Sequence, residues 1–276
     1  MDVISENRSH GGVQGVYSHA SAVTGTDMTF AVFVPDHDDD AELPLLWYLS
    51  GLTCTHANVM EKGEYRRLAS ELGLIIICPD TSPRGTNVPD DPSYDIGQGA
   101  GFYVDATESP WAEHFRMRSY IEQELPQLVS EKFPADMTKQ GIFGHSMGGH
   151  GALTVALRNP DRFKSVSAFA PIVSPSTVPW GQKALDQYLG NNREDWRKYD
   201  TCALIANGAR VPDILVDQGM ADNFLEEQLQ PELLSEACKT AGIELELNMR
   251  PDHDHSYYFI SSFMDNHLRW HADRLR

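Results

Sequence analysis

The chain has 276 residues, of which 41% are hydrophobic, and it carries a formal net charge of −18 at pH 7. This length and apolar content are enough to bury the core of one substantial domain. The acidic balance argues against extended binding to nucleic acid or to anionic membranes, because both need a basic surface. The longest aliphatic run, residues 74–78, is far too short to cross a bilayer.

Residues 1–12 are polar and lack the basic-then-apolar pattern of an export signal. The cysteines are scattered and form neither a CxxC motif nor a cluster with histidines: Cys54, Cys78, Cys202 and Cys238. This spacing favours reduced thiols over a disulfide framework or a zinc site. We therefore expect a soluble, cytoplasmic protein that binds no metal.

The chain opens with residues 13–34, whose alternating polarity and β-branched content predict an antiparallel ribbon, and residues 36–42 are expected to form a solvated loop. Short apolar runs then predict buried strands at residues 45–49, 74–78, 142–143, 166–170, 214–217 and 243–248. Longer periodic stretches predict helices at residues 59–72, 111–133 with a kink near Pro126, 152–157, 224–241 and 257–271.

This alternation of buried strands and helices predicts an α/β fold with a mainly parallel central sheet and helices on both faces. We expect a single domain over residues 1–276. Residues 79–101 form a long loop rich in Pro, Gly and Asp, and such loops are usually functional. Residues 171–212 are turn-rich, with a short helical piece at 183–189, and are expected to form a cap-like insertion over a pocket.

The motif Gly144-His145-Ser146-Met147-Gly148 has the Gly-x-Ser-x-Gly spacing of a nucleophile elbow. A short strand precedes it, and an apolar helical run follows until Asn159-Pro160 stops it. The flanking glycines remove side chains that would collide with the neighbouring strand and helix. No Gly-Lys-Ser/Thr ending and no Gly-x-Gly-x-x-Gly motif supports a phosphate loop instead. The context predicts that Ser146 is a catalytic nucleophile.

A serine nucleophile needs a histidine base, and that base needs a carboxylate that orients it. In this fold the partners follow in the order Ser, Asp or Glu, His, each after a late strand. Asp222 is favoured over Asp217 as the acid because it lies farther out in its loop, although Asp222 could instead cap the next helix. His255, immediately before the last helix, is favoured over His253 as the base. These two histidines could also bind zinc, but no third ligand group stands out.

The oxyanion hole of such an enzyme needs two backbone amides. One is expected from Met147, directly after the nucleophile. The other is expected from Leu52, in the segment Ser50-Gly51-Leu52-Thr53-Cys54, where the glycine lets the chain turn inward.

These motifs resemble those of the S-formylglutathione hydrolase family, also called esterase D, from about residue 10 to the C-terminus. The similarity rests on residues 50–54 (Ser-Gly-Leu-Thr-Cys), 79–85 (Pro-Asp-Thr-Ser-Pro-Arg-Gly), 99–106 (Gly-Ala-Gly-Phe-Tyr-Val-Asp-Ala), 144–151 (Gly-His-Ser-Met-Gly-Gly-His-Gly), 167–172 (Ser-Ala-Phe-Ala-Pro-Ile), 179–181 (Pro-Trp-Gly) with Lys183 and Ala184, and 254–259 (Asp-His-Ser-Tyr-Tyr-Phe).

The resemblance implies an α/β-hydrolase that splits S-formylglutathione into glutathione and formate, without a cofactor and often as a homodimer. It also implies Ser146 as nucleophile, Asp222 as acid, His255 as base, the Leu52 and Met147 amides as oxyanion hole, and Cys54 close to the nucleophile. Two features depart from the family pattern: His56 stands where relatives more often carry an acidic residue, and Pro251-Asp252-His253 replaces a glycine-containing segment. Both could alter substrate fit or the pH profile.

Glutathione is negatively charged, so cations are expected beside the site, and Arg84 and Lys183 lie in matching loops; surface ion pairs are the alternative for both. Trp180 is expected to wall a tight acyl pocket, with a packed core position as its alternative. The rival functions are a general carboxylesterase for oxygen esters, an inactive scaffold, and an enzyme that uses Cys54 as its nucleophile.

Overall fold

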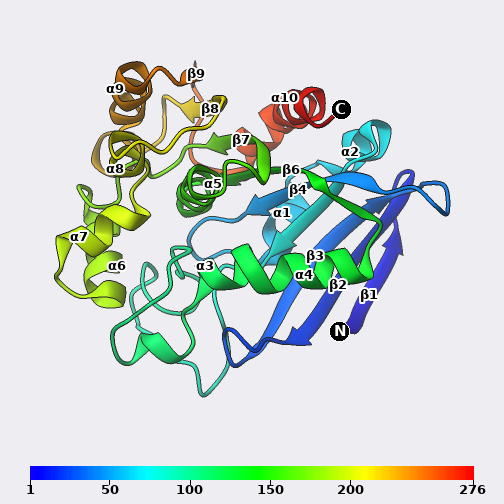
Figure 1. The fold of residues 1–276 in the computed structure, drawn as a ribbon, viewed down its shortest axis with the longest axis horizontal. Coiled ribbons are helices and arrows are strands. Elements are labelled where there is room, and N and C mark those ends of the chain that lie inside the picture. Colours follow the sequence, from blue (N-terminus) through cyan, green and yellow to red (C-terminus); the bar gives the residue numbers. More distant parts are fainter.

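The centre of the molecule is a nine-stranded mixed sheet (Figure 1), and the computed structural model describes all 276 residues. The strand order is β1-β2-β3-β5-β4-β6-β7-β8-β9. The strands are β1 (Asp2–Arg8), β2 (Gly12–Ala20), β3 (Asp27–Pro35), β4 (Leu43–Leu49), β5 (Ile75–Pro79), β6 (Ala135–His145), β7 (Phe163–Phe169), β8 (Asp213–Gly219) and β9 (Glu244–Arg250).

Pairing within the sheet changes from antiparallel to parallel along its width. Strands β1, β2, β3 and β5 pair antiparallel with one another in that order, whereas β5, β4, β6, β7, β8 and β9 pair parallel. The carboxyl ends of these parallel strands therefore meet at one edge of the sheet, where loops can bring functional groups together. The predicted opening ribbon and the mainly parallel α/β sheet are both confirmed.

The helices cover both faces of the sheet, as two aromatic contacts on β3 illustrate. The ring of Phe30 packs on Phe133 after α4, and the ring of Phe33, which points to the opposite face, packs on Tyr65 before α2. The helices are α1 (His56–Lys62), α2 (Arg66–Leu72), α3 (Met117–Ser119), α4 (Leu125–Lys132), α5 (Met147–Arg158), α6 (Pro179–Leu189), α7 (Arg193–Trp196), α8 (Thr201–Ala206), α9 (Pro231–Ala241) and α10 (Tyr257–Leu275). None of them combines the length and the apolar character that a membrane span requires.

Three predicted helices are interrupted in the structure. The helix expected at residues 59–72 is two helices, because α1 ends at Gly63 and Glu64 adopts a left-handed conformation (φ 57°). The stretch 111–133 is a 3₁₀ turn (Trp111–Glu113), α3, a π-helical turn (Tyr120–Glu124) and α4. Its main break precedes α3. Residues 117–132 are then continuously helical, and the π-helical turn lies directly before the segment that contains Pro126. The third predicted helix, residues 224–241, is divided into a π-helical turn and α9 at Gln230, whose backbone is left-handed.

A single hydrophobic cluster of 73 buried residues runs from β2 to α10. It includes side chains of the segment 171–212, among them Trp180, Leu185, Tyr188 and Trp196. The segment is more helical than expected, since α6, α7 and α8 all lie in it. Its buried side chains are therefore part of the main core.

Candidate active site

Ser146 lies at a sharp turn between the end of β6 and the start of α5. Its backbone angles, φ 58° and ψ −118°, fall in a strained region that nucleophile elbows occupy. The flanking glycines make this turn sterically feasible. A Cβ atom on Gly148 would lie 1.9 Å from the carbonyl oxygen of Leu49, and one on Gly144 would lie 2.3 Å from that of Gly148. The backbone geometry therefore explains the spacing seen in the sequence.

Asp222 and His255 are in direct contact beside this turn. Oδ2 of Asp222 lies 2.5 Å from Nδ1 of His255, and Oδ1 accepts a hydrogen bond of 2.8 Å from the amide of Phe224. The side chain of Asp222 is fully buried, and that of His255 is mostly buried. Asp222 thus binds the amide of Phe224 with one oxygen and the imidazole of His255 with the other, so the contact with the base and the alternative backbone contact occur together.

The alternatives Asp217 and His253 make other contacts. Both carboxylate oxygens of Asp217 accept hydrogen bonds from Nη2 of Arg250, at 3.0 and 3.1 Å. Nδ1 of His253 lies 2.8 Å from the carbonyl oxygen of Pro251, and its ring packs on Phe263 at a centroid distance of 4.8 Å. Neither residue lines the cavity at Ser146. His253 and His255 therefore have different hydrogen-bond partners.

The loops that carry Asp222 and His255 are bonded to each other through their backbones. The amide of Met220 donates to the carbonyl oxygen of Arg250, and the amide of Ala221 donates to that of His253, both at 2.9 Å. These bonds extend the parallel pairing of β8 and β9 beyond the ends of the strands. They fix the acid and the base relative to each other.

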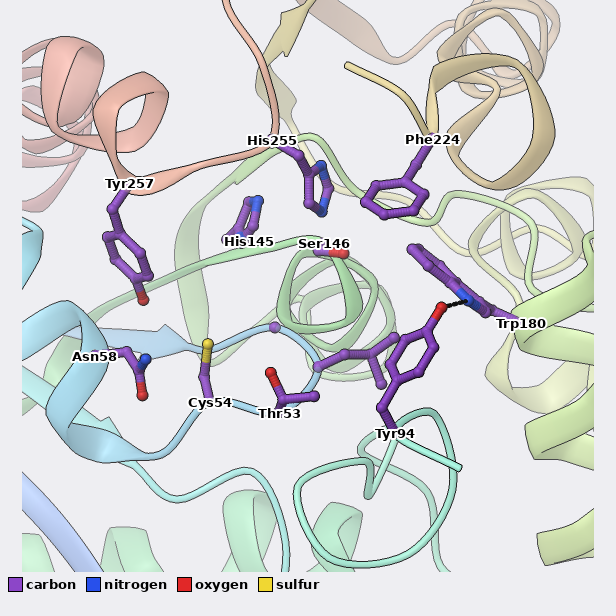
Figure 2. A pocket seen from close by; sticks show the side chains of 12 residues that line it. Thr53, Cys54, Asn58, Tyr94, His145, Ser146, Trp180, Phe224, His255 and Tyr257 are labelled. Carbon is purple, nitrogen blue, oxygen red and sulfur yellow. Dashed lines mark hydrogen bonds between the residues drawn. The ribbon is translucent and has the colours of Figure 1, made fainter. Parts of the chain in front are cut away.

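A cavity of about 300 Å³ opens above Ser146 (Figure 2). Tyr257, Asn58 and Cys54 lie on one side of the serine in this view, and Phe224, Trp180 and Tyr94 lie on the other. The twelve lining residues are Gly51, Leu52, Thr53, Cys54, Asn58, Tyr94, His145, Ser146, Trp180, Phe224, His255 and Tyr257. The cavity therefore has one aromatic wall and one more polar wall.

The aromatic wall is continuous with the imidazole of His255. The indole N–H of Trp180 donates a hydrogen bond of 2.9 Å to the hydroxyl of Tyr94. Trp180 packs on Phe224 at 4.5 Å between ring centroids, and Phe224 packs edge-on against His255 at 5.1 Å. Trp180 therefore both lines the cavity and belongs to the hydrophobic core, while the ring packing restricts the orientation of His255.

The segment with Leu52 passes directly against the serine. A Cβ atom on Gly51 would lie 3.2 Å from the Cβ of Ser146. The segment is anchored by hydrogen bonds from the Tyr103 hydroxyl to the carbonyl oxygen of Ser50 and from the amide of Thr53 to that of Gly99, both at 2.9 Å. The amide of Leu52 itself donates no hydrogen bond. That of Met147 belongs to the first residue of α5, so it has no acceptor within the helix.

Arg84 and Lys183 are engaged with carboxylates and do not line the cavity. Nε of Arg84 lies 3.0 Å from both oxygens of Asp80, and Nη2 donates at 3.0 Å to the carbonyl oxygen of Cys54. Arg84 thus braces the Cys54 segment, and its predicted contact with substrate is not supported. Nζ of Lys183 lies 2.6 Å from Oδ1 of Asp95, which matches the alternative of an ion pair.

Several lining residues were not singled out from the sequence. Tyr94 comes from the long loop before α3, and Asn58 comes from α1. Phe224 and Tyr257 each lie two positions after a predicted triad residue, which is the one clue that could have identified them. Aromatic and amide side chains are common throughout the chain, so only the tertiary structure distinguishes these four.

Burial governs the protonation of two further groups in the cavity. Burial raises the pKa of the Cys54 thiol above its ordinary value, although Tyr257, Lys62 and Arg84 oppose the shift. A protonated thiol is a poor nucleophile, so Cys54 is poorly suited to replace Ser146. Burial also holds the pKa of His145 well below its usual range. That ring, 4.3 Å from the ring of His255, is therefore neutral at physiological pH.

Comparison with known proteins identifies the family. The family model described as "Putative esterase" matches residues 21–270. The chain belongs to the esterase family. It is 52% identical over 274 residues to an S-formylglutathione hydrolase of Paracoccus denitrificans (strain Pd 1222), and the match covers 99% of this chain and 98% of that protein. The expected similarity to this group of esterases is thereby confirmed.

Solved structures extend the comparison of this esterase. A structure of an S-formylglutathione hydrolase from Agrobacterium tumefaciens matches with a TM-score of 0.99 and 60% identity, over 100% of both chains. A structure of the fluorophosphonate-binding serine hydrolase FphF of Staphylococcus aureus matches with a TM-score of 0.76 and 20% identity, over 95% of this chain and 98% of that one. The second match concerns the fold alone, and together they confirm the predicted α/β-hydrolase fold.

Proposed function

We propose that this esterase hydrolyses the thioester S-formylglutathione to glutathione and formate through a formyl-serine intermediate. The observation that carries the proposal is the contact between Asp222 and His255 beside the strained Ser146, in a cavity open to a small substrate. The substrate follows from the two relatives, 52% and 60% identical, that are named S-formylglutathione hydrolases.

In the first half of the reaction, Ser146 Oγ attacks the formyl carbon. Asp222 accepts a hydrogen bond from Nδ1–H of His255, which fixes the tautomer and leaves Nε2 free to take the hydroxyl proton of the serine. The formyl oxygen becomes an oxyanion, and the amides of Leu52 and Met147 donate hydrogen bonds to it. The unoccupied amide of Leu52 supports this assignment.

The intermediate then collapses, and the bond between the formyl carbon and sulfur breaks. The thiol of glutathione has an ordinary pKa of about 8.5, so the sulfur leaves readily and takes the proton from Nε2 of His255. Water, deprotonated by the same nitrogen, attacks the formyl-serine. The bond to Ser146 Oγ breaks, formate leaves, and the serine regains its proton.

A carboxylesterase that acts on oxygen esters is the second candidate. It is favoured by the aromatic wall of Tyr94, Trp180 and Phe224 and by a cavity of about 300 Å³, because a formyl group fills little of such a space. The specificity constants for S-formylglutathione and for short aryl acetates distinguish the two candidates. A larger constant for the aryl esters would favour the second.

The direct test is turnover of S-formylglutathione by the purified protein and by its Ser146→Ala variant. We expect the variant to lose several powers of ten in kcat, up to about 10⁶-fold, because the triad acts as a unit. An unchanged thermal melting curve would show that the loss is chemical. Turnover that survives in Ser146→Ala would exclude the serine as nucleophile.

We also propose that the protein is a cytoplasmic homodimer. The four cysteines are free thiols in the structure, which suits a reducing compartment. The dimer rests on the resemblance to the family, and light scattering of the purified protein tests it.

A further inference from the structure

A second cavity, of about 580 Å³, adjoins the polar side of the active site. Its lining includes Tyr257, which also lines the cavity at Ser146. We call it the outer cavity, and it is lined by Lys62, Glu64, Ser256, Tyr257, Tyr258 and Ser261. None of these residues was predicted to bind substrate. The outer cavity lies where α1 ends and α10 begins.

Helix α1 connects the two cavities. Asn58 lines the cavity at Ser146, and Lys62, on the next turn of α1, lines the outer cavity. Residues four apart share one face of a helix and are separated by about 6 Å along its axis. Figure 2 shows Asn58, Cys54 and Tyr257 together on the side of Ser146 that faces away from Trp180. The face of α1 that carries Asn58 and Lys62 therefore leads from one cavity to the other.

The outer cavity presents two opposite charges that have no partners. Lys62 and Glu64 are both exposed, and neither forms an ion pair with any residue of the chain. The positive charge of Lys62 is close enough to Cys54 to lower the pKa of that thiol, against the effect of burial. Glu64 has a left-handed backbone (φ 57°), which is uncommon for residues other than glycine. Both charges are therefore available to a ligand near the active site.

We propose that the outer cavity binds the γ-glutamyl end of glutathione, with its α-carboxylate on Lys62 and its α-ammonium group on Glu64. This inference rests on the proposed function. The γ-glutamyl arm spans roughly 7 Å from the cysteinyl residue, comparable with the separation of Asn58 and Lys62. The zwitterionic end matches a neighbouring cation and anion, whereas the glycyl end carries only a carboxylate.

The proposal fixes the direction of the substrate in the active site. The thiol leaves along the wall of Cys54 and Asn58, and the formyl group faces Trp180 and Phe224. The exposed ring of Tyr258 flanks the outer cavity and can cover the methylene groups of the glutamyl arm. In this proposal Lys62 and Glu64 recognise the peptide. The cations predicted for this role, Lys183 and Arg84, are paired with Asp95 and Asp80 instead.

The test uses S-methylglutathione, an unreactive thioether, as an inhibitor of aryl acetate turnover. Lys62→Gln and Glu64→Gln are each expected to raise its inhibition constant about fivefold, the range of a solvent-exposed charge contact. The KM for S-formylglutathione should rise by a similar factor, with the change on KM rather than on kcat. Lys139→Gln is the matched control, because this substitution removes the same charge as Lys62→Gln. Lys139 is exposed on β6 and lines neither cavity.

A truncated inhibitor, S-methylcysteinylglycine, which lacks the γ-glutamyl group, isolates the contact. Its inhibition constant should be the same for the wild-type protein and for Lys62→Gln. If Lys62→Gln leaves the constant for S-methylglutathione unchanged, or if Lys183→Gln raises it instead, the proposal is wrong. Wild-type turnover of S-formylglutathione reports separately on the proposed function, and inhibition by S-methylglutathione reports on the outer cavity whatever the natural substrate is.

Discussion

Oδ2 of Asp222 lies 2.5 Å from Nδ1 of His255, although the two residues are 33 positions apart in the chain. Asp217, on the strand that leads into the same loop, binds Arg250 instead. The carboxylates of β8 and of the loop after it therefore have different partners. Asp222 orients the imidazole beside Ser146, and Asp217 joins β8 to β9.

Substitution of these two carboxylates should separate catalysis from stability. Asp222→Asn is expected to lower kcat by about 10⁴-fold, because the imidazole loses the partner that sets its tautomer. Asp217→Asn is expected to lower the free energy of unfolding by about 2 kcal/mol, because it leaves the mostly buried Arg250 without its counter-charge. Steady-state kinetics and urea denaturation of both variants measure the two effects. The reverse assignment of the two losses would overturn the triad.

The thiol of Cys54 should affect activity only when it is modified. Cys54→Ser is expected to retain turnover within a few-fold, whereas alkylation of the wild-type thiol should block it by filling the cavity. Because burial raises the pKa of the thiol, alkylation should be slow near neutral pH and accelerate in more alkaline solution. Mass spectrometry and residual activity follow the reaction, with Cys54→Ser as the resistant control. A variant without activity would make Cys54 the nucleophile.

Burial of His150 makes the protein sensitive to acid. Burial lowers the pKa of His150 from 6.5 to about 4, and its Nε2 lies 2.9 Å from the carbonyl oxygen of Phe102. Between these two pH values the unfolded chain binds a proton that the folded chain excludes, so the free energy of unfolding falls as the pH is lowered. The loss is on the order of 3 kcal/mol for this residue.

Urea denaturation at about pH 7.5 and about pH 4.5 measures this loss. His150→Gln should give a shallower pH dependence, because the amide can donate to the same carbonyl oxygen and does not titrate in this range. Equal slopes for the two proteins would show that other groups cause the acid sensitivity.

Gly148, two positions after the nucleophile, should not tolerate a methyl group. Gly148→Ala places Cβ 1.9 Å from a backbone carbonyl oxygen, so the turn or β4 must move, and we expect a loss of about 3 kcal/mol or more. Gly242→Ala is the control, since that position is left-handed but has open space and should cost only about 1 kcal/mol. Thermal melting compares the two. A melting temperature for Gly148→Ala above that of the control would contradict the elbow geometry.

The buried strands and the elbow were predictable because both leave local patterns. The strand residues 74–78 form a continuous apolar run, and β5 occupies Ile75–Pro79. The glycines around Ser146 reflect a steric demand within a few residues of the chain. The order of the triad follows from the fold, so Asp222 and His255 could be favoured before their contact was seen.

Features that depend on distant partners were not predictable. Strand β1 is exposed on nearly all of its length, so it has no alternation of polar and apolar residues that would reveal it. The helix break before α3 falls at Arg116, which carries no typical breaking signal, whereas the break between α1 and α2 had a local clue in Gly63. The carboxylates that bind Arg84 and Lys183 were not predictable either, because ion-pair partners are set by how loops meet in space.

The backbone bonds from Met220 and Ala221 to the carbonyl oxygens of Arg250 and His253 have a consequence for motion. Because they fasten the acid loop to the base loop, thermal fluctuation of one carries the other with it. The opposite rim, where Trp180 meets Tyr94, is held by contacts between side chains. We therefore expect the aromatic rim to fluctuate more than the distance between the Asp222 carboxylate and the His255 imidazole.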